Sequence, residues 1–318
     1  MPVDPRIQEL LDKGAGVPAT NTLSVPAARA QYEARVALMP PAAAVAGVEE
    51  RSIDEAGCAL RMRIYRPLGD GPLPLLLFFH GSGFVLCSLD THDGICRNLC
   101  AGARCIVVSV DYRLAPEHKF PAGLDDCLFA TRWAAQHAAE LGADGRRVAI
   151  AGDSAGGNLA AAVALRMRDE GRPALSGQLL IYPVTDYHTP GTPSYRENAD
   201  GYGLTRDTMI WFWDHYLADP AEATHPYASP LRAKSLAHLP PALVVTAEFD
   251  PLRDEGEAYA TRLREAGVPT VTSRWDGMNH GFFFWVGMID GATDAMAESC
   301  AWLRGIFAAE ERGASTSR

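Results

Sequence analysis

Long apolar runs and positive charge are both scarce in this sequence. The longest apolar stretch, "PLLLFF" at residues 74–79, is far shorter than the roughly 20 residues that a membrane-spanning helix needs. Residues 1–16 also lack the basic segment and apolar core of a signal peptide. With 29 Lys and Arg against 39 Asp and Glu, the net charge of −10 opposes binding to a phosphate backbone. We therefore expect a cytoplasmic protein whose partners include neither a membrane nor a nucleic acid.

Cysteine occurs without the pairing that disulfide or metal frameworks require. The count of 7 is odd, and in a chain with no export signal this favours reduced thiols. The stretch "DTHDGICRNLCAGARC" offers His92, Asp93, Cys96, Cys100 and Cys105 as candidate metal ligands, but paired C-x-x-C spacing is missing. Cys96 and Cys100 lie one helical turn apart, as core-facing residues of a helix do. We expect neither a metal nor another cofactor.

Short apolar runs alternate with helix-length segments along most of the chain. Most of these runs are apolar on successive residues, which is typical of strands covered on both faces. The alternation predicts an α/β fold with a mostly parallel central sheet flanked by helices. Strands are expected to begin near Leu60, Leu73, Arg104, Arg147, Gly177, Ala242 and Thr270, and helices to span residues 92–102, 121–140, 155–170, 253–267 and 291–309.

Two stretches interrupt this alternation. The second separates consecutive strands and carries Trp211, Phe212, Trp213 and Tyr216, which would be costly to leave in water. We interpret both stretches as a helical cap over the carboxyl edge of the sheet; for the second, a surface insertion without contact to the site is the alternative. The predicted division is N-terminal cap helices at 1–45, the first part of the core at 46–186, a cap insertion at 187–238, the second part of the core at 239–310 and a disordered tail at 311–318.

The stretch "VAIAGDSAGGNLAAAVAL" at residues 148–165 passes from a strand to an alanine-rich helix through a sharp turn. Ser154 lies at that turn, and open α/β sheets bind ligands at the carboxyl ends of their strands. Gly152 and Gly156 flank it where a side chain would collide with neighbouring backbone. This is the G-x-S-x-G nucleophile elbow of the α/β-hydrolase fold, which predicts that Ser154 is a nucleophile. An N-cap of the following helix is the alternative.

A serine nucleophile needs a base, and the base needs an orienting acid. The strand in "LVVTAEFDPLRDEG" ends at Asp250, and the last strand runs into a glycine-containing loop that carries His280. No other histidine follows a strand beyond Asp250, and the order Ser, Asp, His is that of the fold. We predict Asp250 as the acid and His280 as the base. Alternatively, Asp250 caps the next helix while Asp254 or Asp276 serves the histidine.

The glycine-rich stretch "FFHGSGFVLCS" at residues 78–88 follows a strand and exposes consecutive backbone N–H groups. Together with the N–H of Ala155, these groups can stabilise the negative oxygen of a tetrahedral intermediate. A tight turn without a catalytic role is the alternative. In "DYRLAPEHKFP", Glu117 and His118 could form an acid–base pair, but a structural loop that braces the site is the preferred interpretation.

Several motifs in order carry a resemblance to a known family. These are "HGSGFV", "DYRLAPEHKFPA" at 111–122, "GDSAGGNLAA" at 152–161, "YPVTD" at 182–186, "DPLRDEG" at 250–256 and "NHGF" at 279–282. Over nearly the entire chain the sequence resembles the bacterial hormone-sensitive-lipase family of carboxylesterases, in its GDSAGG branch. The resemblance implies an α/β-hydrolase core with a helical cap and the hydrolysis of short- to medium-chain acyl esters without a cofactor. Homodimers are common among similar proteins, so we also expect a homodimer.

The family pattern also implies roles for individual residues. Its nucleophile, acid and base fall on Ser154, Asp250 and His280. Its oxyanion-hole donors fall on Gly81, Ser82, Gly83 and Ala155, with Ser82 and Gly83 preferred within the loop, while His80 holds the loop in shape. Its pocket walls fall on Phe84, Asp153, Leu204, Trp211 and Phe212.

One residue departs from the pattern, because the family usually has three glycines after the histidine and Ser82 replaces the middle one. If this position needs a positive φ, serine costs on the order of 1 kcal/mol. If it does not, the hydroxyl adds a polar group beside the oxyanion. In both cases the backbone N–H is retained.

Two other functions fit parts of this pattern. The same triad could cleave amides or aryl-formamides if the leaving amine were protonated well. A non-catalytic ligand-binding protein on this fold is the other alternative, as in the plant gibberellin receptor, which resembles the family but lacks the catalytic histidine. The presence of His280 argues against the second alternative.

Overall fold

Eight strands form one sheet at the centre of the computed structural model, which describes residues 2–55, 58–69, 71–171 and 175–316. The strand order is β1-β2-β4-β3-β5-β6-β7-β8. From β4 to β8 all neighbours are parallel, whereas β2 is antiparallel to both β1 and β4, so the expected mostly parallel sheet is confirmed. The strands are β1 (Gly47–Glu55), β2 (Cys58–Arg66), β3 (Leu73–Phe79), β4 (Ile106–Asp111), β5 (Ala143–Asp153), β6 (Gly177–Ile181), β7 (Ala242–Phe249) and β8 (Thr270–Asn279).

The seven expected strands are present, and β1 is the strand that the sequence pattern did not reveal. Its sequence, "GVEERSIDE", has no apolar run, and Ile53 is its one buried side chain. Because β1 lies at the edge of the sheet, charged side chains on it remain in water and protect the edge from pairing with another chain.

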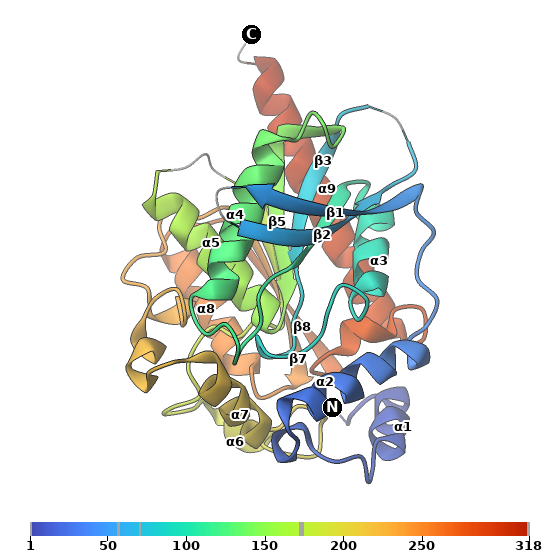
Figure 1. Cartoon of the computed structure of the whole chain (residues 1–318), viewed down its shortest axis with the longest axis vertical. Helices are drawn as coiled ribbons and strands as arrows, with labels where there is room; N and C mark the ends of the chain where they lie inside the picture. Colours follow the sequence, from blue (N-terminus) through green and yellow to red (C-terminus); the bar gives the residue numbers. More distant parts are fainter. Residues whose placement is uncertain (1, 56–57, 70, 172–174, 317–318) are drawn as a thin grey trace.

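Helices cover both faces of the sheet (Figure 1). The strands between them alternate their side chains, so Leu75 and Leu77 of β3 join one apolar core and Leu76 and Phe78 join the other. One core is closed by α4 (Ala122–Gln136), α5 (Ala155–Asp169) and α8 (Arg253–Glu265), and the other by α3 (Asp93–Ala103) and α9 (Asp290–Thr316). This two-sided burial explains why the strands between them are apolar on successive residues.

The two stretches outside the alternation gather at one end of the molecule, far from the end of α9 (Figure 1). Helix α7 of the second stretch packs against the 3₁₀ turn η1 of the first. The first contains α1 (Pro5–Lys13), η1 (Thr20–Thr22), α2 (Val25–Ala34) and η2 (Arg35–Leu38), and the second contains α6 (Pro193–Glu197), α7 (Arg206–Tyr216), η3 (Pro220–Thr224) and η4 (Pro230–Arg232).

Helix α9 continues to Thr316, so residues 311–316 of the expected disordered tail are helical, and residues 317–318 lie outside the described residues. The alanines and glutamates that precede Gly313 favour a helix, and no proline interrupts them. Within the described residues, no helix has both the length and the apolar character to cross a membrane.

The strand register brings distant segments to one edge of the sheet. Phe79 pairs with Gly152, so the loop after β3 and the turn after β5 begin side by side. At the other side of this edge Phe249 pairs with Asn279, and the next residues along the chain are Asp250 and His280. Parallel strands all end at the same edge, which is why these loops meet.

Candidate active site

The turn between β5 and α5 has a backbone that demands glycine on both sides of Ser154. Ser154 itself has φ 55° and ψ −119°. A Cβ on Gly152 would lie 2.2 Å from the carbonyl oxygen of Gly156, and a Cβ on Gly156 would lie 1.9 Å from that of Phe79. Neither contact is possible for a real side chain, so the two glycines allow the strand, the turn and the helix to approach one another closely.

Ser154, His280 and Asp250 form a continuous hydrogen-bonded series. Oγ of Ser154 lies 3.0 Å from Nε2 of His280, and Nδ1 of His280 lies 2.7 Å from Oδ2 of Asp250. Asp250 is completely buried, and Ser154 is 6% exposed. Ser154 occupies the N-cap position of α5, but its side chain makes no capping hydrogen bond, so the alternative that it serves as an N-cap is not supported.

Asp250 combines the two roles that the sequence left open. Its Oδ1 accepts a hydrogen bond of 2.9 Å from the backbone N–H of Leu252 at the start of α8, while Oδ2 faces the histidine. Asp254 accepts from the N–H of Ser194, and Asp276 pairs with Arg274, so neither replaces it.

Asn198 is a buried polar residue that the sequence did not mark as part of the site. Its side-chain amide donates to the carbonyl oxygens of Glu248 and Asp250 at 3.2 and 3.1 Å. Asn198 lies in the insertion between β6 and β7, and its buried amide holds the end of β7 in place. Nothing in its local sequence distinguishes it from a loop residue.

The loop after β3 presents backbone N–H groups beside this series. Ser82 and Gly83 have φ 78° and 64°, and among the described residues their N–H groups and that of Ala155 donate no hydrogen bond. The N–H of Gly81, in contrast, donates to Oδ1 of Asp153 at 2.9 Å. The expectation that Gly81 is an oxyanion donor is therefore wrong, because its N–H is already used.

The Ser82 hydroxyl points to a thiol, since Sγ of Cys87 donates to Oγ of Ser82 at 2.9 Å. With φ at 78°, the first of the two expectations for this residue holds, and serine costs on the order of 1 kcal/mol relative to glycine.

His80 is buried against Tyr112, with ring centroids 4.4 Å apart, and its Nδ1 lies 3.0 Å from the carbonyl oxygen of Gly81. Burial, together with a smaller effect of the neighbouring His92, lowers the pKa of His80 to about 3. The imidazole is therefore neutral and braces the loop.

The insertion contacts the glycine-rich loop directly. A Cβ on Gly83 would lie 2.1 Å from the ring of Phe212, and Phe84 stacks on Tyr216 with ring centroids 3.7 Å apart. The alternative of an insertion without contact to the site is therefore wrong. Leu204 and Trp211, expected as pocket walls, are half-buried in the same segment.

Asp153 differs from the expectation of a pocket wall. It is 2% exposed, and its carboxylate faces the backbone of the loop and the ring of His92. A Cβ on Gly81 would lie 2.5 Å from its Oδ2, so the carboxylate fills the space beneath the loop. Asp153 therefore braces the loop and does not line an open pocket.

Glu117 is held by a residue of the N-terminal segment. Arg29 of α2 donates to both carboxylate oxygens at 2.8 and 2.7 Å, and this contact lowers the pKa of Glu117. The same guanidinium donates to the carbonyl oxygens of Val85 and Ala115 at 2.9 and 3.0 Å. Glu117 thus fastens the N-terminal segment to the loop, as a structural residue does, and does not form an acid–base pair with His118.

The candidate metal ligands do not converge. Cys96, Cys100 and Cys105 are buried free thiols in the core beneath α9, where burial raises their pKa values. His92 points to Asp153. In the part of the chain that the structure describes, no three His, Cys, Asp or Glu side chains are placed to hold a metal ion.

A groove of about 500 Å³ lies away from the serine. It is lined by Glu33, Val36, Arg63, Asp90 and Asp93, and Arg63 is already paired with carboxylates. This groove carries no group that the chemistry of the serine requires.

A serine joined by hydrogen bonds to a histidine and a buried aspartate, at the carboxyl edge of a mostly parallel sheet, is the arrangement of the α/β hydrolases. Residues 76–284 match the family model described as the alpha/beta hydrolase fold, and the chain belongs to that family. It is 44% identical to esterase LipI of Mycobacterium tuberculosis over 81% of both chains, and 40% identical to carboxylesterase NlhH of the same organism over 95% of both. A hyperthermophilic esterase from the archaeon Pyrobaculum calidifontis superimposes with a TM-score of 0.92 at 41% identity, over 96% of this chain and 99% of that one. The resemblance to hormone-sensitive-lipase-family esterases is thereby confirmed.

Proposed function

We propose that the protein is a serine carboxylesterase that acts through an acyl-enzyme on Ser154. The observation that carries the proposal is the pair of distances that join Ser154 to His280 and His280 to Asp250, 3.0 and 2.7 Å. These are hydrogen-bonding distances between a nucleophile, a base and an orienting acid. The esterase relatives support the same reaction.

The geometry supports the following steps. Nε2 of His280 takes the hydroxyl proton as Oγ of Ser154 attacks the ester carbonyl, and buried Asp250 stabilises the imidazolium that forms. The oxyanion accepts hydrogen bonds from the unused N–H groups of Ser82, Gly83 and Ala155. His280 returns the proton to the leaving alkoxide, the alcohol departs, and an ester of Ser154 remains. Water then attacks this ester by the same proton transfers and releases the carboxylic acid.

The proposed substrates are small-molecule esters with short to medium acyl chains, hydrolysed without a cofactor. An ethyl acetate hydrolase of Pseudomonas putida, 40% identical over 76% of both chains, supports the short end of this range. Phe84, Leu204, Trp211 and Phe212 are the proposed apolar walls.

We place the chain in the GDSAGG branch because residues 152–157 carry that motif. Location in the cytoplasm and assembly as a homodimer are further proposals from the sequence. Sedimentation velocity of the purified protein tests the second of these.

The function is tested by Ser154→Ala, with hydrolysis of p-nitrophenyl acetate and butyrate as the assay. We expect kcat to fall by on the order of 10⁶, because the nucleophile is lost while the fold is kept. Mass spectrometry should detect one organophosphonate adduct on the wild type and none on the variant. Substantial esterase activity in the purified variant would contradict the proposal.

A further inference from the structure

A second His–Asp pair lies next to the nucleophile and takes no part in the steps above. Nε2 of His92 lies 3.2 Å from Oδ1 and 3.4 Å from Oδ2 of Asp153, the residue that precedes Ser154. Both side chains are buried, with His92 at 0% and Asp153 at 2% exposure. The backbone N–H of Gly81 donates to the same Oδ1 at 2.9 Å.

The hydrogen-bond donors and acceptors around His92 indicate that its ring holds the carboxylate of Asp153. The backbone N–H of Gly81 also lies 3.3 Å from Nε2 of His92, a longer contact than its 2.9 Å hydrogen bond to Oδ1 of Asp153. Because a bare Nε2 lone pair facing two carboxylate oxygens would be repulsive, we assign the ring proton to Nε2, where it donates to Asp153. With the proton on Nε2, Nδ1 accepts from the hydroxyl of Thr91 at 2.9 Å, and the same hydroxyl lies 2.9 Å from the carbonyl oxygen of Ser88. The ring therefore fixes the carboxylate, and the carboxylate fixes Gly81.

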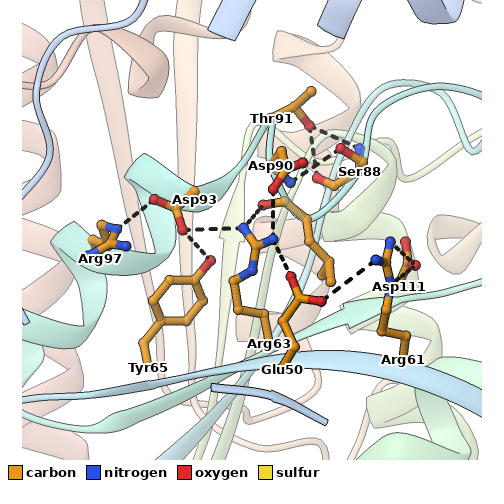
Figure 2. Close-up of polar contacts among 11 residues, drawn as sticks. Glu50, Arg61, Arg63, Tyr65, Ser88, Asp90, Thr91, Asp93, Arg97 and Asp111 are labelled. Atoms are coloured by element: carbon orange, nitrogen blue, oxygen red, sulfur yellow. Dashed lines mark hydrogen bonds and ion pairs between the residues drawn. The ribbon is translucent and has the colours of Figure 1, made fainter. Parts of the chain in front are cut away.

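The segment that carries His92 is itself held from outside by Arg63 of β2 (Figure 2). Arg63 binds Asp90 at 2.7 Å and Asp93 at 3.4 Å. Figure 2 also shows Thr91 turned toward Ser88, with its Oγ1 3.0 Å from the backbone nitrogen of Ser88. His92 is thus placed between an anchored segment and the loop.

The loop needs such a restraint. Ser82 and Gly83 both have positive φ, and this conformation is sterically strained for the Ser82 side chain. Their N–H directions depend on the peptide planes that follow Gly81, because peptide units are rigid. Holding the N–H of Gly81 on Asp153 leaves the next two N–H groups free for an oxyanion.

We propose that Asp153 and His92 are positioning residues that keep the oxyanion loop aimed at Ser154. The proposal rests on the proposed function, since it concerns the oxyanion of that reaction. Asp153 acts as the hydrogen-bond acceptor of Gly81, and His92 acts as the donor that holds Asp153. Neither residue exchanges a proton with the substrate.

Asp153→Ala removes the acceptor, and Asp153→Asn keeps an oxygen for the N–H of Gly81. We expect kcat of Asp153→Ala to fall about 30- to 300-fold with KM changed less than about threefold, because misplacing one oxyanion donor costs up to about 10³-fold. Asp153→Asn should remain within about fivefold of the wild type. His92→Phe, which fills a ring-sized space beside Phe284 without a donor, should lose about tenfold in kcat.

The distinguishing measurement is the inhibition constant of a trifluoromethyl ketone, whose adduct on Ser154 carries an oxyanion. In Asp153→Ala and His92→Phe this inhibition constant should rise by about the same factor as kcat/KM falls. Asp144→Ala is the control, because it removes a largely buried carboxylate bound to Arg147 at the start of β5. In that variant we expect stability to fall while the inhibition constant stays within threefold.

The proposal is overturned if folded Asp153→Ala keeps kcat and the inhibition constant within threefold of the wild type. It is also overturned if Asp153→Asn loses as much as Asp153→Ala, since the charge and not the acceptor would then matter. If Asp153→Ala does not fold, an unchanged inhibition constant in His92→Phe overturns it. Failure of the proposed function is separate, because it would appear as activity in Ser154→Ala.

Discussion

The buried imidazole of His80 makes stability depend on pH in a way that can be measured. Burial lowers the pKa of His80 to about 3 in the folded protein, against 6.5 in the unfolded chain. Its Nδ1 lies 3.0 Å from the carbonyl oxygen of Gly81, and in the described residues its Nε2 has no partner that could accept a second proton. The folded state therefore binds fewer protons than the unfolded state between pH 6.5 and 3.

The direction in which stability changes with pH follows from this difference in bound protons. Above pH 6.5 the imidazole is neutral in both states and contributes no pH dependence. As the pH falls below 6.5, the unfolded chain takes up a proton that the folded protein cannot, so stability is lost. The slope approaches about 1.4 kcal/mol per pH unit, and the loss between pH 7 and pH 5 is about 2 kcal/mol.

His80→Asn isolates this contribution, because the asparagine amide can donate to Gly81 in place of Nδ1 but does not titrate. Urea-induced unfolding, followed by tryptophan fluorescence at pH 5, 6, 7 and 8, gives the free energy of unfolding of each protein. The difference between wild type and variant should be constant from pH 7 to 8 and should shift toward the variant by about 2 kcal/mol at pH 5. A difference that stays flat down to pH 5 would refute the assignment of a neutral, buried His80.

Two further substitutions test the loop and its attachment to the N-terminal segment. Ser82→Gly keeps the N–H and removes the strain of a side chain at positive φ, but it loses the contact with Cys87. We therefore expect less than a tenfold change in kcat, and a loss near that of Ser154→Ala would show that the hydroxyl is catalytic. Arg29→Met removes charged hydrogen bonds to Val85 and neighbouring groups and should lower the free energy of unfolding by roughly 1–3 kcal/mol, whereas Arg206→Met on the surface of α7 should change it by less than about 0.5 kcal/mol. Equal effects of the two arginine variants in urea unfolding would contradict this role of Arg29.

The turn around Ser154 was predictable because the interactions that shape it are local. A strand, two glycines two residues either side of Ser154, and a helix define the turn within a few residues of sequence. The predicted acid and base also lie at strand ends, and parallel strands end at one edge, so their meeting follows from chain order. The apolar runs revealed seven strands for the same reason, since two-sided burial leaves a continuous mark on the sequence.

Other features depend on contacts between segments whose local sequences do not indicate that they will meet. The use of the Gly81 N–H depends on where the carboxylate of Asp153 lies, 72 positions away. Asn198 and Arg29 resemble ordinary polar residues until the fold places backbone carbonyls in front of them. Strand β1 was not predicted because an edge strand with one buried side chain needs no apolar run. Sequence periodicity records which face of an element is buried, and it therefore determined the sheet and the elbow. The partner of each buried polar group depends on distances across the molecule, and only the tertiary structure decided these.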